Sequence, residues 1–264
     1  MVSFKLFKIE HPTTLTFFKD VALIALIIII LLSSTTVFAR QWPPIWLVSG
    51  ESMFHEDNNG FGNIGTLDAG DIVIVQKITT VSDVVTYYQA KQTGYVTYGM
   101  PGDVILFKVS SNGCNRVLHR AIAYVELNYT HDYVTYDIPE LGYFGNATVH
   151  LDEFNLTIHP KVSGFITKGD ANAYCDQSLS EDGLSELQPI ELENIIGVAR
   201  GEIPWIGITK ILIDDSLYGN HGISHVSPEC FTMYLVFVVL VVFIPIMYYI
   251  CSFVKKKQKT LKKT

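Results

Sequence analysis

The stretch Gly-Asp-Val-Ile-Leu-Phe at 102–107 indicates how the middle of this chain folds. Glycine accepts a positive φ, and the carboxylate after it accepts hydrogen bonds from nearby backbone N–H groups, so a Gly-Asp pair signals a turn. The branched and aromatic residues that follow are typical of a β-strand. Gly-Asp-Ile-Val-Ile-Val at 70–75 repeats this arrangement. We therefore expect strands over Ile72–Val75 and Val104–Val109, each beginning at a turn.

Further runs of branched and aromatic residues continue the pattern on both sides of this stretch. They lie at 116–125, 129–136, 148–158, 164–167 and 195–198. The sequence between residues 40 and 230 shows no convincing helical periodicity, and therefore predicts a mainly β domain of antiparallel strands. Residues 124–160 resemble a hairpin insertion in that domain.

Two uncharged apolar segments, Val21–Ala39 and Phe231–Val254, flank the β region. About 20 apolar residues cross the hydrocarbon core of a bilayer, so each segment predicts a transmembrane helix. Lysines gather before the first segment and after the second, and cytoplasmic flanks collect such residues. We expect a two-pass protein of the cell membrane, with cytoplasmic tails at 1–20 and 255–264 and an extracytoplasmic domain at 40–230.

The first apolar segment has a second interpretation, a cleaved export signal, because Val37 and Ala39 place small residues before a possible cut. The length of the apolar run and of the lead before it favour a retained anchor.

The middle domain is acidic, with 10 Lys and Arg against 24 Asp and Glu. Such a surface repels nucleic acid, so we exclude nucleic-acid binding. Glycosylation sequons at Asn128, Asn146 and Asn155 agree with an exported domain. An oxidising exterior would permit a disulfide between Cys114 and Cys175, and the cysteines show no metal-ligand spacing.

A serine, a histidine and two candidate acids, the residue types that serine hydrolysis needs, arrive in order along the domain: Ser52, His119, Asp170 and Asp176. A serine hydroxyl becomes a nucleophile when a base takes its proton and an acid orients that base. His119 lies in an alternating run, and imidazole is the ordinary proton shuttle near neutral pH. Either carboxylate is able to accept the imidazole N–H.

Other bases are conceivable. His55, three residues after Ser52, would have to fold back tightly on it. A serine-lysine enzyme would use Lys77, Lys108 or Lys168. A lysine must lose its water contacts to act as a base near neutral pH, and Lys168 in a glycine-flanked loop is poorly placed for that.

Six stretches in order resemble the type I signal peptidases, within the archaeal and endoplasmic-reticulum branch that has histidine in place of a lysine base. They are Ser-Gly-Glu-Ser-Met (49–53), Gly-Asp-Ile-Val-Ile-Val (70–75), Gly-Asp-Val-Ile-Leu-Phe (102–107), Val-Leu-His-Arg-Ala-Ile (117–122), Phe-Ile-Thr-Lys-Gly-Asp-Ala-Asn (165–172) and Ile-Ile-Gly-Val-Ala-Arg-Gly-Glu-Ile-Pro-Trp-Ile-Gly (195–207).

This resemblance implies an antiparallel β fold shared with self-cleaving repressors, flanked here by two transmembrane helices. It implies cleavage of export signals after small residues, without metal or cofactor. Ser52 would be the nucleophile, His119 the general base, Asp176 the orienting acid and Asp170 a second required carboxylate. The implied partners are the signal peptides of exported preproteins, membrane lipid and the protein translocation channel.

The chain departs from the family pattern at two places near Ser52. Phe-His-Glu-Asp at 54–57 follows the serine-methionine pair, where the family commonly has a proline. Gly50 stands where the family commonly has an oxyanion-binding serine, and Ser49 lies one residue further back. We expect Ser49, Gly50, Ser52 and Met53 to form the oxyanion and substrate-binding segment, with the Ser52 N–H as one donor and the second donor open.

These departures leave two alternatives to an active peptidase. The chain could be a catalytically inactive subunit or substrate receptor of the same fold. The sequons and the tyrosine-rich β segment also suit a surface adhesion or envelope protein.

Overall fold

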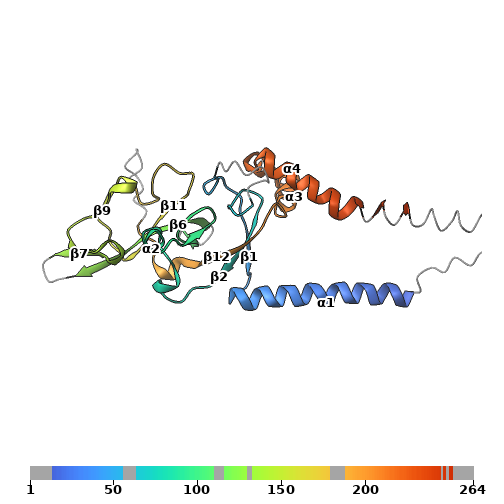
Figure 1. Cartoon of the computed structure of the whole chain (residues 1–264), viewed down its shortest axis with the longest axis horizontal. Coiled ribbons are helices and arrows are strands. Elements are labelled where there is room, and N and C mark those ends of the chain that lie inside the picture. The colour runs from blue at the N-terminus through green and yellow to red at the C-terminus, as the bar shows by residue number, and fades with distance from the viewer. Residues whose placement is uncertain are drawn as a thin grey trace, which may run out of the picture. The chain divides into compact units, whose positions relative to one another are not determined.

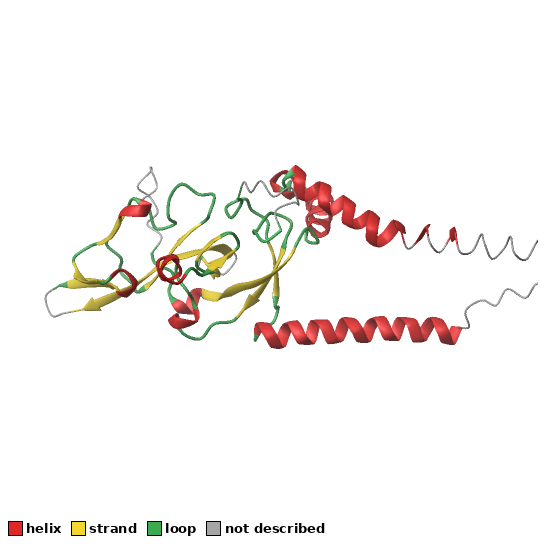
Figure 2. Ribbon diagram, viewed as in Figure 1, coloured by secondary structure: helices red, strands yellow, loops and turns green. Residues whose placement is uncertain are grey.

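The computed structural model describes residues 14–55, 64–109, 116–129, 133–178 and 188–244, together with 246, 247, 250 and 251. The chain divides into two compact units, Met1–Pro44 and Ile45–Thr264. The first contains helix α1 (Thr14–Ala39), and the second contains the strands and the other helices (Figure 1, Figure 2).

The strands of the second unit are mostly short. They are β1 (Ile45–Leu47), β2 (Ile72–Gln76), β3 (Val96–Thr97), β4 (Met100–Pro101), β5 (Val104–Lys108), β6 (Arg116–Tyr129), β7 (Val134–Ile138), β8 (Tyr143–Asn146), β9 (Val149–Leu151), β10 (Leu156–Ile158), β11 (Gly164–Lys168) and β12 (Ile195–Ile203). Its α-helices are α2 (Tyr87–Thr93), α3 (Ile208–Tyr218) and α4 (Pro228–Val238).

Eight strands form one sheet among the described residues, in the order β1-β2-β12-β5-β6-β7-β8, with β11 pairing with β6. All of these pairings are antiparallel. The long strand β6 pairs first with β5, then with β11 and finally with β7. The predicted mainly antiparallel β fold is therefore confirmed.

Strand β5 contains four consecutive apolar residues, Val104–Phe107, because it is buried on both faces. Val104 and Leu106 pack into one buried cluster, and Ile105 and Phe107 pack into another. Successive side chains of a strand point to opposite faces. Because both faces of β5 are covered, every position from 104 to 107 is apolar.

The two Gly-Asp turns form as predicted. Gly70 and Gly102 have φ values of 106° and 92°, which glycine adopts without strain. The Asp71 carboxylate accepts the N–H three residues before it at 2.9 Å, and Asp103 accepts the N–H of Val85 at 2.9 Å. A Cβ at Gly102 would also lie 2.7 Å from a backbone nitrogen, so the turn leaves no room for a side chain.

The predicted single strand over 129–136 is wrong. Tyr129 ends β6 and pairs with Val134 at the start of β7, so the alternating pattern runs through a hairpin. The run at 148–158 likewise divides into β9 and β10, which pair around a short 3-10 turn ending at Asn155 in the left-handed region. Aromatic and branched residues on both arms hide such turns from a pattern-based prediction.

The absence of helices between residues 40 and 230 was also a wrong prediction. Helix α2 has seven residues. The Thr86 hydroxyl caps its start by accepting the N–H of Gln89, and Gly94 caps its end in the left-handed region. Helix α3 has eleven residues and buries only Ile208 and Ile211. Both helices are too short, and bury too few side chains, to produce a clear 3.6-residue pattern.

Helix α1 includes the first apolar segment. Val21–Ala39 has a mean hydropathy of 2.8 and is, among the described residues, the one helical segment long and apolar enough to cross a membrane. The second apolar segment begins as α4, where the Ser227 hydroxyl accepts the N–H of Cys230. The apolar helix described there, Pro228–Val241, is shorter than a span. Most of both predicted tails, and the end of the second predicted span, lie outside the described residues.

Candidate active site

His119 and Asp176 form a hydrogen-bonded pair on the sheet. His119 is 7% exposed, and its Nδ1 lies 2.7 Å from Asp176 Oδ2. The same carboxylate oxygen accepts the Thr167 hydroxyl at 2.6 Å, and the Asp176 N–H donates to the Thr167 carbonyl at 2.8 Å. Thr167 pairs with Ala121 across β11 and β6, so strand pairing brings the carboxylate to the imidazole. The role of Thr167 could not be predicted from the sequence, because neighbours across a sheet leave no local signal.

Ser52 is held against the loop that follows β11. Its carbonyl accepts the N–H of Ala171 at 2.9 Å, while the next residue, Met53, is 1% exposed in the core. Lys168 ends β11 and pairs with Arg120, the residue after the histidine in β6. The serine turn and the imidazole are therefore attached to the same end of the β6–β11 pair. Among the described residues, the Ser52 hydroxyl makes no hydrogen bond.

Asp170 does not pair with His119. Arg120 donates two hydrogen bonds to the Asp170 carboxylate, from Nε to Oδ1 at 2.8 Å and from Nη2 to Oδ2 at 2.6 Å. His55 Nε2 lies 2.7 Å from Asp170 Oδ2. Burial by itself would raise the pKa of Asp170, but the hydrogen bonds from Arg120 and His55 outweigh it and hold the pKa below its usual value.

The predicted oxyanion segment has an exposed and a buried end. Ser49 and Gly50 are exposed, and a Cβ at Gly50 would meet no atom within 4 Å. Met53 packs with Val48 and Leu67 in a core cluster. Its side chain therefore anchors the turn from the core side, and only its backbone is left to contact a substrate as the predicted segment requires.

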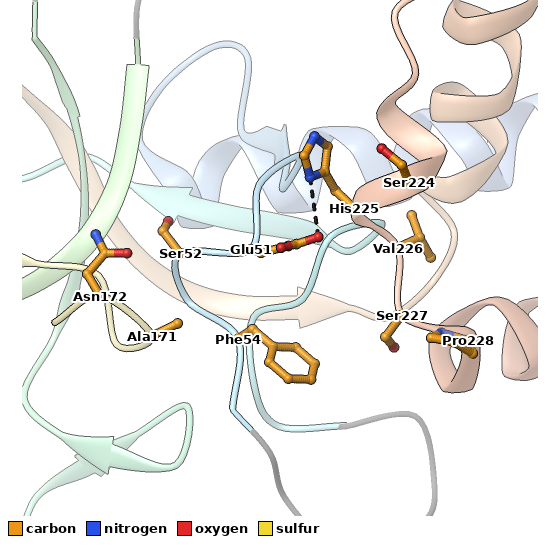
Figure 3. Close-up of a pocket in the computed structure, with 10 residues that line it drawn as sticks. All are labelled: Glu51, Ser52, Phe54, Ala171, Asn172, Ser224, His225, Val226, Ser227 and Pro228. Carbon is orange, nitrogen blue, oxygen red and sulfur yellow. Dashed lines mark hydrogen bonds and ion pairs between the residues drawn. The ribbon is translucent and has the colours of Figure 1, made fainter.

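A cavity of about 520 Å³ opens beside Ser52 (Figure 3). Ser52 and Asn172 line it on one side, and the segment Ser224–Pro228, which leads into α4, lines the other. His225 Nδ1 lies 3.3 Å from Glu51 Oε1 across this opening, as the dashed line shows. This side of the cavity could not be predicted from the sequence, because it lies far from Ser52 along the chain. The Ser-Pro pair at 227–228 indicates only that a helix starts there.

The alternative lysine bases are not buried. Lys77 and Lys108 are exposed, and Lys168 is partly buried and donates to the Gly169 carbonyl at 3.2 Å. None of the three has the dry environment that a lysine base requires.

Cys175 is not bridged in this structure, so the disulfide that an oxidising exterior would permit is not formed here; Cys114 lies outside the described residues. Cys175 is a buried free thiol, and burial raises its pKa to about 12. The thiol is therefore protonated at neutral pH and suits a packing role.

No protein-family model matches the chain. The signal peptidase complex catalytic subunit SEC11 of Schizophyllum commune is 29% identical over 122 residues, which cover 46% of this chain and 53% of that subunit. The catalytic subunits SEC11C of Homo sapiens and Mus musculus are 35% identical over 63 residues, which cover 23% of this chain and 31% of each subunit. The chain thus spans about half or less of the length of these curated relatives. Its homologues are catalytic subunits of signal peptidase complexes, in agreement with the motifs of its sequence.

Proposed function

We propose that this chain is a membrane-bound serine endopeptidase that removes signal peptides from exported proteins by cutting after small residues. The observation that carries the proposal is the His119–Asp176 pair, attached to the same strand end as the Ser52 turn. The homology to signal peptidase catalytic subunits supports the substrate class.

The roles follow from which ring nitrogen is occupied. Asp176 accepts the proton on Nδ1 of His119, which leaves Nε2 as the acceptor for the Ser52 proton. The Ser52 oxygen attacks the peptide carbonyl, the imidazolium protonates the leaving amine, and an acyl-enzyme forms. Water activated by the same imidazole then releases the acyl group. Catalytic hydrogen bonds often tighten only in the substrate complex, so the unbonded Ser52 hydroxyl is compatible with this role.

The substrate would reach Ser52 as an extended strand. Strand β1 is the end strand of the sheet order and leads along the chain into the Ser52 turn. An extended peptide adds to a sheet edge through backbone hydrogen bonds, and shallow pockets then select small side chains. The cavity beside Ser52 leaves room for such a peptide next to the nucleophile. The apolar segment of α1 ends thirteen residues before Ser52, so only a short stretch of chain separates the anchor from the nucleophile.

The topology that we propose has two spans with both tails in the cytoplasm. The lysines before the first apolar segment and after the second support this topology, because positively charged flanks tend to stay in the cytoplasm. The translocation channel and membrane lipid would then be neighbours of the domain that holds Ser52.

Cleavage of a preprotein tests this function. The full chain in lipid vesicles is mixed with a preprotein whose export signal ends in alanine, and mass spectrometry identifies the product's new N-terminus. We expect one cut directly after the alanine. Replacing that alanine by tryptophan should abolish the cut. An intact preprotein, or cuts that ignore the small residue, would contradict the proposal.

Gly169→Ala tests the contact between the Ser52 turn and the loop after β11. A Cβ at Gly169 would lie 2.6 Å from the Ser52 carbonyl oxygen and 2.7 Å from Asn172 Nδ2. The backbone oxygen cannot swing aside, so the serine must move, and a misplacement of about 1 Å costs about 10²-fold in rate. Gly201→Ala is the control, because the nearest atom to its Cβ would be the end of the Ile74 side chain, at 3.3 Å. Equal preprotein cleavage by both folded variants would contradict this packing argument.

Gly50→Ser tests the oxyanion segment. The new Cβ meets open space, so the fold should tolerate it, and the hydroxyl adds a donor beside the Ser52 N–H. One oxyanion donor is worth up to about 10²–10³-fold in rate. We expect kcat of preprotein cleavage to rise in Gly50→Ser and not in Gly50→Ala. An equal kcat in both variants would show that the second donor lies elsewhere.

A further inference from the structure

A second imidazole–carboxylate pair adjoins the Ser52 turn. His55 lies three residues after Ser52, and its Nε2 is 2.7 Å from Asp170 Oδ2. The two side chains are 14% and 4% exposed, so solvent screens this contact weakly. Next to Asp170, the Ala171 N–H donates to the Ser52 carbonyl at 2.9 Å. The serine turn is thus bonded to the loop after β11 at two points, one of them a side chain.

The loop end of this contact is rigidly held. Arg120 is 1% exposed and binds both oxygens of Asp170. Its Nη1 donates at 3.1 Å to the carbonyls of Thr97 and Met100. A planar guanidinium with fixed donors leaves the carboxylate little freedom. Because Arg120 follows His119 in β6, one continuous chain of contacts joins the serine turn to the strand that carries the base.

The geometry argues against His55 as a base. Its Nε2 is occupied by Asp170, which Arg120 keeps ionised. On the other edge of the ring, Nδ1 and Cε1 face Gly99, at 3.7 and 3.8 Å from where a Cβ of that residue would lie. The His55 ring therefore lies between Asp170 and the β3–β4 turn, and neither of its nitrogens faces the Ser52 hydroxyl as a hydrogen-bond partner.

We propose that His55 is a positioning residue, which fastens the Ser52 turn to Asp170 and so sets the nucleophile relative to His119. The inference rests on the proposed peptidase function. The Nε2–H donates to the ionised carboxylate, a charge-assisted hydrogen bond that is stronger than a neutral one. Met53 holds the turn from the core side and His55 from the loop side, so Ser52 lies between two fixed points.

A matched pair of variants tests the role. Gln and Met have side chains of equal length, but only Gln has an N–H donor for Asp170. We expect His55→Met to lower kcat about 10²-fold, because the serine turn loosens, with KM little changed. His55→Gln should recover most of that loss. His150→Met is the control, since His150 forms an exposed pair with Asp152 in the insertion.

The measurement is preprotein cleavage by the full chain in vesicles, per folded molecule, with the folded fraction from circular dichroism. A His55→Met variant with wild-type kcat would overturn the proposal, as would His55→Gln impaired as much as His55→Met. A change in KM alone would also overturn it, because it would indicate substrate contact. A wild-type chain that leaves the preprotein intact would instead contradict the peptidase function itself.

Discussion

Ser52→Ala is expected to end cleavage of an exported preprotein while the protein stays folded. Removing the nucleophile of a serine protease triad costs about 10⁶-fold in kcat, so no product should be detectable. The Ser52 hydroxyl makes no hydrogen bond among the described residues, and its removal therefore costs the fold little. Thermal unfolding and membrane insertion should match the wild type.

The control for this variant is another serine on the same unit. Ser216 is exposed in α3, where its hydroxyl donates to the Leu212 carbonyl one turn before it. Ser216→Ala should cleave at the wild-type rate. Wild-type turnover by Ser52→Ala would remove the nucleophile from the mechanism and with it the proposed chemistry.

Asp176→Ala should lower kcat by about 10⁴-fold, the typical loss when the acid of a triad is removed. Without the carboxylate, His119 Nδ1 loses its acceptor at 2.7 Å, and the imidazole is neither oriented nor stabilised as it takes a proton. His119→Ala should cost at least as much. Asp152→Ala, which breaks an exposed histidine–aspartate pair instead, should leave preprotein cleavage unchanged.

Asp170→Ala should behave differently from Asp176→Ala, and the difference separates the two carboxylates. Its loss leaves Arg120, which is 1% exposed, without its counter-charge, and an unpaired buried charge is strongly destabilising. We expect a lower unfolding temperature together with lost activity. If Asp176→Ala unfolds the domain while Asp170→Ala only slows cleavage, the assignment of the two acids is reversed.

Because the pKa of Asp170 is lowered, the contribution of Asp170 to the stability of the fold decreases in acid. The folded-state pKa lies below the ordinary value of 3.8, so this contribution is complete well above that value. It is lost as the pH falls through the folded-state pKa. Asp170→Asn should therefore flatten the loss of thermal stability in acid relative to the wild type.

Local sequence patterns predicted the strands that carry or adjoin the site residues. The Gly-Asp turns and branched runs indicated β2, β5, β6, β11 and β12, because turn chemistry and side-chain alternation are local properties. The hairpin between β6 and β7 was missed, since the same aromatic and branched residues continue through both arms. Helix α2 was missed because its stability comes from a cap and one buried residue, Ala90.

The partners of the site residues depend on strand pairing and could not be read along the chain. Asp170 and Asp176 are six residues apart and equally acidic in sequence. Only the register of β11 against β6 turns the second toward His119 and the first toward Arg120. The wall at Ser224–Pro228 is a tertiary contact with the Ser52 region and likewise has no local signature.

Covalent labelling by a serine-acylating probe tests the central claim most directly. The wild-type chain in vesicles is treated with the probe, digested and mapped by mass spectrometry. The account predicts one adduct on Ser52 that fails to form in His119→Ala and in Asp176→Ala. An unlabelled wild-type chain that also leaves preproteins intact, or an adduct that forms equally well without His119, would contradict it.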